Sequence, residues 1–150
     1  MAGVINRMRD ITAFLNTQKE SYDRFGQNEA PKYITWSCRN NSRLLRLVAE
    51  DENRTSFVLR SPDSGLNPYI AFSMIIQAGL SGIKNGEELM EPLEKKTAEI
   101  GDLERAELMH LPLSLREAVR YAGASDFIKQ GDFKDIAERF LMVLSDKEML

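Results

Sequence analysis

The sequence is poor in the residue types on which several protein classes depend. Cys38 is the single cysteine among 150 residues, so no internal disulfide can form, which favours a reducing compartment. We predict that Cys38 is a small core residue on the apolar face of a strand. His110 is the single histidine, and without a histidine or cysteine cluster we expect it to be structural rather than a metal ligand or nucleophile.

Charge and hydropathy exclude two further classes. The formal net charge is −3, whereas nucleic-acid-binding domains usually carry a basic excess, so we expect no nucleic-acid partner. No run free of polar residues reaches the roughly 20 positions of a membrane span, and the first eleven residues lack the apolar core of a signal peptide. We therefore expect a cytoplasmic protein without membrane contact, folded as a single domain over residues 1–150.

Hydrophobic periodicity predicts an α+β chain. Val4, Met8, Ile11 and Leu15 form the apolar stripe of a first helix, and residues 17–31 read as a loop. Three strands follow with short connections, which predicts an antiparallel meander; they are expected at residues 32–38, 44–49 and 55–60.

The second half of the sequence predicts helices. A long, charged connection with short helical pieces, at residues 84–108, is expected to be solvated surface. A capping box at residues 114–117 starts a helix that we expect to end at Gly123. A short helix through Gln130 and a final helix capped by Asp132 complete the chain.

The stretch at residues 56–72 joins the third strand to the most apolar segment. Alternation places Val58 and Arg60 on the same strand face. Asn67 reads as a helix N-cap and Pro68 as the first helical residue. Residues 69–83 are apolar on nearly every side, so we expect a buried helix with the meander packed on it and further helices at its flanks.

Basic side chains concentrate on the predicted meander. Residues 30–49 contain Lys32, Arg39, Arg43 and Arg46 and no acidic residue. Arginines at strand ends suit an anion site because each guanidinium offers a fixed fork of donors to phosphate or carboxylate. Arginines also coat ordinary sheet surfaces, so composition leaves both interpretations open.

Several short motifs, taken together and in order, resemble one known family. They are ITAFLN (11–16), SYDR (21–24), EAP (29–31), ITWS (34–37), RSPD (60–63) with NPY (67–69), AGLSGIKN (78–85) and LPLSLREAV (111–119). This series resembles the C-terminal part of the glutamine synthetase catalytic domain. The resemblance implies that the family's small N-terminal domain and the first half of its catalytic domain are absent here.

Glutamine synthetases join glutamate and ammonium, using ATP and Mg²⁺ or Mn²⁺, and the resemblance implies a homo-oligomer. It places Arg24 and Arg60 toward glutamate and its phosphate, and Arg39 and Arg46 toward the nucleotide phosphates. Glu29 matches the glutamate that closes over the ammonium site. Glu29 and Arg60 are thus the expected catalytic residues of a complete enzyme.

Two positions depart from the family pattern. Asn41 replaces an arginine that contacts the transferred phosphoryl group, and Val58 replaces a metal-binding glutamate. Valine has no lone pair to offer a metal, so we predict no metal ligand here and no catalysis by the isolated chain. The alternatives are a non-catalytic module that binds an anion or a protein through the retained arginines, and a remnant of the fold without a ligand.

Overall fold

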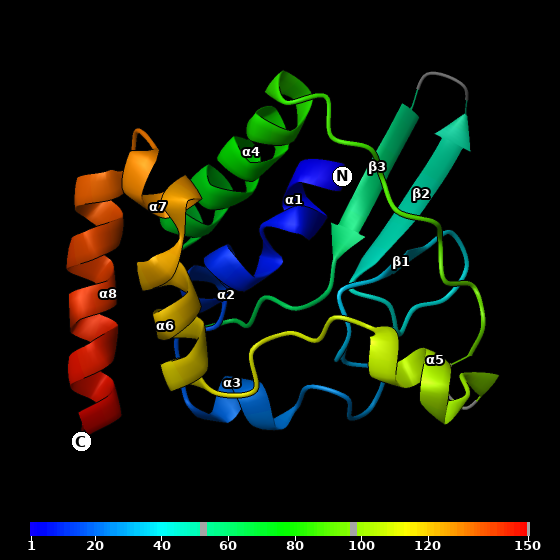
Figure 1. Cartoon of the computed structure of the whole chain (residues 1–150), viewed down its shortest axis with the longest axis horizontal. Helices are drawn as coiled ribbons and strands as arrows, with labels where there is room; N and C mark the ends of the chain where they lie inside the picture. The colour runs from blue at the N-terminus through cyan, green and yellow to red at the C-terminus, as the bar shows by residue number, and fades with distance from the viewer. Residues whose placement is uncertain (52–53, 97–98, 150) are drawn as a thin grey trace.

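Most helices lie on one side of the molecule and the three strands on the other (Figure 1). The structure is a computed structural model that describes residues 1–51, 54–96 and 99–149. Its helices are α1 (Ala2–Asn6), α2 (Met8–Leu15), α3 (Glu20–Asp23), α4 (Pro68–Lys84), α5 (Asp102–Glu107), α6 (Leu115–Ala124), α7 (Asp126–Gln130) and α8 (Lys134–Met149). Its strands are β1 (Trp36–Ser37), β2 (Leu45–Asp51) and β3 (Arg54–Leu59). The α+β class is confirmed.

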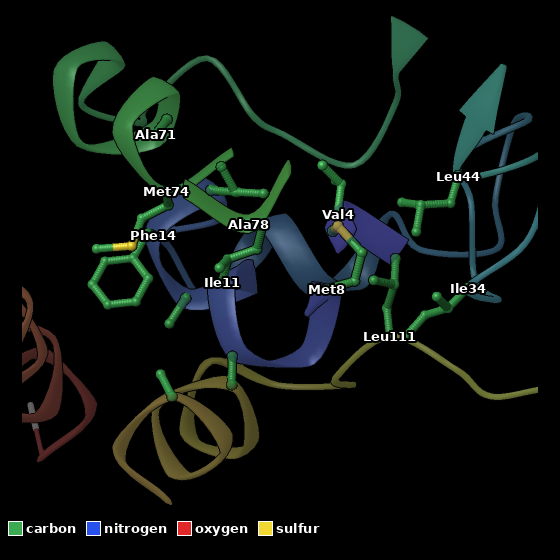
Figure 2. Packing of buried hydrophobic residues seen from close by; sticks show 14 of the residues in the cluster. Val4, Met8, Ile11, Phe14, Ile34, Leu44, Ala71, Met74, Ala78 and Leu111 are labelled. Atoms are coloured by element: carbon green, nitrogen blue, oxygen red, sulfur yellow. The ribbon is translucent and has the colours of Figure 1, made fainter. Parts of the chain in front are cut away.

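The helical layer is built around α2. The predicted stripe of Val4, Met8, Ile11 and Leu15 is buried, although it is divided between α1 and α2 by a break at Arg7. Figure 2 shows α2 between α4 and α6, with its apolar side chains directed toward both helices. Burial of this stripe is the main source of stability that the sequence pattern predicted.

The sheet differs from the predicted antiparallel meander. The pairing of β2 with β3 is antiparallel, as expected, but β1 pairs with β2 in parallel. The predicted strand at 32–38 is divided because the N–H of Ile34 donates to the carbonyl of Met109 (2.7 Å) and that of Leu111 to Lys32 (2.9 Å). The Ser37 hydroxyl accepts the N–H groups of residues 39 and 40, which coils the following loop so that β2 starts in the same direction as β1. The short connection expected between the second and third strands lies partly outside the described residues.

Helix α4 begins as expected and is buried less than expected. The Asn67 side chain accepts the N–H groups of Tyr69 and Ile70, and Pro68 is the first helical residue. The prediction of a helix buried on nearly every side is wrong, because α4 packs on α1 and α2 with one face and leaves the opposite face exposed. Among the described elements α4 packs mainly on α1 and α2 rather than on the strands, so the prediction of a meander packed on this helix is also wrong.

Two predicted limits of the C-terminal helices are wrong: α6 does not end at Gly123, and α8 begins at Lys134, so Asp132 is not its N-cap. The Ser114 hydroxyl caps α6, while Glu117 accepts the N–H of Leu113. Gly123 lies within α6 instead of ending it, and Ser125 caps α7. Along α8 the side chains of Ala137, Leu141 and Leu144 are buried, whereas Ile136 is 49% exposed. No helix of the described residues has the length and apolarity to cross a membrane.

Candidate functional site

Arg24 connects the loop after α3 to the end of β3. Its guanidinium donates to the carbonyl of Ser61 and lies over the ring of Phe25, 5.5 Å from the centroid. The amide of Asn16 donates to the same carbonyl at 2.8 Å. The Nε atom of Arg24 is buried and has no acceptor within the described residues.

Arg60 directly follows β3, beside the residue that Arg24 contacts. Its backbone N–H donates to the carbonyl of Leu44 at 2.9 Å, which fixes Arg60 against the start of β2. The Nε atom of Arg60 is buried and also lacks an acceptor in the part of the chain that the structure describes. The structure thus brings Arg24 and Arg60, which are 36 positions apart in the sequence, to the same end of the sheet.

Arg46 and Val58 are direct cross-strand partners on β2 and β3. Val58 is 44% exposed, so the position where the family carries a glutamate faces solvent next to an arginine. Arg46 donates to the amide oxygen of Asn41 at 2.9 Å. Its Nε atom is buried and, among the described residues, has no acceptor. Asn41 therefore accepts one hydrogen bond from the Arg46 guanidinium without neutralising its charge.

A hollow of about 950 Å³ opens beside this sheet end. Its basic lining consists of Lys32, Arg39, Arg43, Lys96 and Arg105. Glu29 and Glu94 are the acidic side chains in its lining. Of the site residues that the sequence indicated, Glu29 and Arg39 line this hollow, whereas Arg24, Arg46 and Arg60 lie outside its lining.

Glu29 sits in an unusual backbone conformation at the rim. Asn28 and Glu29 have φ values of 46° and 66°, in the left-handed region that non-glycine residues rarely adopt. The loop is closed by hydrogen bonds from Gly26 to Ala30 (3.1 Å) and from Ala30 to Gln27 (2.8 Å). Such strain, of order 1–3 kcal/mol per residue, persists where the surroundings impose it and often marks a functional loop.

Glu94 is a site residue that the sequence analysis missed, since it was assigned to solvated surface. Its carboxylate accepts from the Ser37 hydroxyl (2.7 Å) and from the N–H groups of Cys38 (2.8 Å) and Arg39 (3.3 Å). The hydroxyl of Ser37, followed by the Cys38 N–H, lowers the pKa of Glu94. Cys38 is exposed, so its prediction as a core residue is wrong.

Arg43 binds the backbone on either side of Glu94. Its side chain is buried and donates to the carbonyls of Leu93 (3.0 Å) and Lys95. Arg43 is therefore a structural tie rather than a free anion ligand. No local signal in the sequence identifies Glu94 or Arg43, because their partners lie at least 50 positions away.

His110 and the acidic residues offer no metal centre. His110 forms a bridge with Tyr33, and its Nδ1 lies 2.7 Å from the carbonyl oxygen of Leu111. Over residues 1–51, 54–96 and 99–149, no group of three or more histidine, cysteine, aspartate and glutamate side chains could hold a metal ion. The donor set around Val58 therefore does not fit the divalent metals that the resemblance implies.

At this end of the mixed sheet, beside a basic hollow, Arg24, Arg46 and Arg60 keep buried Nε atoms without an acceptor among the described residues. Residues 1–149 match the family profile described as glutamine synthetase, catalytic domain. The chain belongs to the glutamine synthetase family, and the resemblance found in the sequence is confirmed.

The curated relatives are all longer than this chain. A glutamine synthetase of Methanosarcina mazei is 37% identical over 144 residues, which are 94% of this chain and 32% of the relative. One from Clostridium saccharobutylicum is 35% identical over 133 residues, 87% of this chain and 30% of the relative. A Staphylococcus aureus enzyme is 35% identical over 143 residues, 93% of this chain and 32% of the relative. The chain thus spans about a third of the length of these relatives.

Proposed function

We propose that this chain is the C-terminal part of a glutamine synthetase-type ATP-dependent glutamate–ammonia ligase and is inactive by itself. The observation that carries the proposal is the set of buried Nε atoms on Arg24, Arg46 and Arg60, none of which has an acceptor in the described residues. A buried donor left without a partner costs about 1–3 kcal/mol. An anionic ligand would remove this cost by supplying acceptor oxygens to all three side chains.

The positions of these arginines suit the binding of different parts of the substrates. Arg24 and Arg60 both lie at the end of β3, where they would bind the glutamate carboxylate and orient its side chain for phosphorylation. Arg46, held by Asn41, would contact the nucleotide phosphates together with Arg39 from the neighbouring hollow. ATP would supply the phosphoryl group, and the chain's own residues would neutralise and position it.

Glu29 fits a loop that closes over ammonium. It is exposed at the rim of the hollow, on a segment with two consecutive left-handed residues. A carboxylate there would attract a cation and accept its proton. Within the described part of the chain, Val58 and its neighbours supply no ligand set for a metal.

The alternative is a non-catalytic module that binds an anion or another protein. Five basic side chains line the hollow, and Asn41 already occupies a donor of Arg46 that a phosphate would use in the family pattern. In this case Arg24, Arg46 and Arg60 would serve binding without chemistry.

A chimera separates the two functions. The matched stretch of the Methanosarcina mazei enzyme is replaced by this chain, and formation of γ-glutamyl hydroxamate is measured. We expect activity at least a hundredfold below that of the parent enzyme, and a large recovery when Val58→Glu and Asn41→Arg are introduced together. Val48→Glu, which adds a carboxylate on β2 instead of at position 58 on β3, is the matched control and should restore nothing.

The outcomes discriminate clearly. A folded chimera that stays inactive with both restoring substitutions would contradict the ligase proposal. Micromolar binding of inorganic phosphate to the isolated chain, combined with that inactive chimera, would support the alternative. Product from the isolated chain that Arg60→Ala abolishes would refute the inactivity of this portion alone.

A further inference from the structure

Glu94 holds the backbone of the loop that carries Arg39. Its carboxylate accepts the Ser37 hydroxyl at 2.7 Å. It also accepts the N–H groups of Cys38 and Arg39, at 2.8 and 3.3 Å. The Ser37 hydroxyl in turn accepts the N–H groups of Arg39 and Asn40, at 3.0 and 2.7 Å. Each of the three successive N–H groups of this loop is therefore bound to Glu94, directly or through Ser37.

The segment that carries Glu94 is itself fixed to the sheet. The N–H of Leu93 donates to the carbonyl of Trp36 on β1, at 2.8 Å. The buried guanidinium of Arg43 donates to the carbonyls of Leu93 and Lys95. Glu94 thus lies between two backbone attachments, and its carboxylate cannot move away from β1 without breaking them.

The charge of Glu94 by itself opposes the binding of an anion. Glu94 and Arg39 both line the basic hollow, where a carboxylate repels phosphate because like charges repel. A favourable contribution of Glu94 must therefore come from its hydrogen bonds, which fix the loop and direct the Arg39 side chain. A side chain whose backbone is fixed loses less conformational freedom on binding, and such preorganisation raises affinity.

We propose that Glu94 is a positioning residue that presents the Arg39 guanidinium to a phosphate group in the hollow. The inference rests on the proposed function, because that function makes Arg39 a phosphate ligand. It adds a residue that acts through the backbone of the loop instead of touching the ligand. Position and charge then have opposite effects on phosphate affinity, which makes the role of Glu94 measurable.

Titration of the isolated chain with inorganic phosphate tests the proposal, with the backbone amide NMR signal of Arg39 as the readout. Ionic strength is held constant, since electrostatic affinities depend on salt. Glu94→Ala should raise the dissociation constant at least about fivefold, although the loss of a negative charge alone would lower it. Glu94→Gln, which keeps one acceptor oxygen, should lie between wild type and Glu94→Ala.

Two further variants separate position from charge. Ser37→Ala leaves the net charge unchanged but removes the hydroxyl between Glu94 and the loop, so it should also weaken phosphate binding. Glu91→Gln is the matched control: Glu91 is exposed and lies three positions before Glu94, and its substitution should change the dissociation constant less than about twofold. Thermal unfolding verifies that each variant folds, and if Glu94→Ala does not, Glu94→Gln and Ser37→Ala decide.

The outcomes distinguish this inference from the proposed function. Variants at Glu94 and Ser37 that bind phosphate as tightly as wild type, or more tightly, would overturn the inference alone. A wild-type Arg39 signal that phosphate does not shift would overturn it and would also remove Arg39 from the proposed function. A chimera that stays inactive, while the Glu94 effect persists in the isolated chain, would refute the ligase proposal and support Glu94 as a positioning residue.

Discussion

The ion pair between Arg7 and Glu87 gives the sharpest test of how this fold is held together. The Glu87 carboxylate accepts both terminal amino groups of Arg7, at 2.9 and 2.6 Å, and the amide of Asn6 at 2.8 Å. It thereby ties α1 to the turn after α4. The side chains of Arg7 and Glu87 are only 12% and 17% exposed. These hydrogen bonds, chiefly those from Arg7, lower the pKa of Glu87 from 4.5 to about 2.

The size of the effect follows from this pKa. A pKa lowered from 4.5 to about 2 corresponds to about 3 kcal/mol. Since the carboxylate keeps some contact with water, solvent screening reduces the contribution to about 1–2 kcal/mol. Glu87→Gln also turns an amide N–H toward the Arg7 guanidinium, so we expect a loss of about 2 kcal/mol at pH 7. The melting temperature should fall by roughly 4–8 °C.

The pH dependence has a definite sign. The folded-state pKa lies below the unfolded value, so the stabilisation is fully present above about pH 4.5 and is lost as the pH falls through 2. Chemical denaturation of wild type and Glu87→Gln from pH 2 to pH 8 should show a gap between their free energies of unfolding. This gap should be constant at the upper end of the pH range and should close in acid. Glu88→Gln, at the exposed neighbouring position, should show no such gap. The reasoning is refuted if Glu87→Gln matches Glu88→Gln at pH 7 or if the gap persists at pH 2.

Two further predictions concern helix packing and nucleotide binding. An added Cβ at Gly82 would overlap the backbone of Gly3, so Gly82→Ala should lower the free energy of unfolding by about 1–3 kcal/mol. Gly123 has open space around it, so Gly123→Ala should raise the free energy of unfolding by about 0.5–1 kcal/mol. Equal effects of the two substitutions in urea unfolding would contradict the close contact between Gly82 and Gly3. The isolated chain should bind ATP with Mg²⁺ no more tightly than about millimolar, or roughly −4 kcal/mol, and a micromolar constant by calorimetry would show a more complete site.

Local patterns in the sequence determined most of the helices and one strand pair. The caps at Asn67 and Ser114 were predictable because a short polar side chain before an apolar run satisfies N–H groups two or three residues away. Alternation predicted strands at 44–49 and 55–60, and β2 and β3 pair antiparallel over nearly these residues. These features depend on residues close together in the chain, so the sequence states them directly.

The candidate site was predictable only in its residue types. The resemblance selected Arg24, Arg39, Arg46 and Arg60, but it could not show that Arg39 lines the hollow while the others keep buried Nε atoms outside it. The sequence did not identify Glu94 as a site residue, because its carboxylate accepts a hydrogen bond from Ser37, 57 positions earlier. No residue near Glu94 in the sequence indicates this partner.

Tertiary structure alone decided which apolar surfaces are covered and which way β1 runs. The apolar run at 69–83 predicts that this helix favours burial, but burial needs a neighbour, and within the described residues α1 and α2 cover one face. Likewise, residues 32–34 pair with residues 109–111, far along the chain, so that only Trp36 and Ser37 remain as β1, parallel to β2. The hydrophobic pattern of a segment determines which of its surfaces are stabilised by burial. Whether such a surface is buried depends on which distant segments of the chain pack against it.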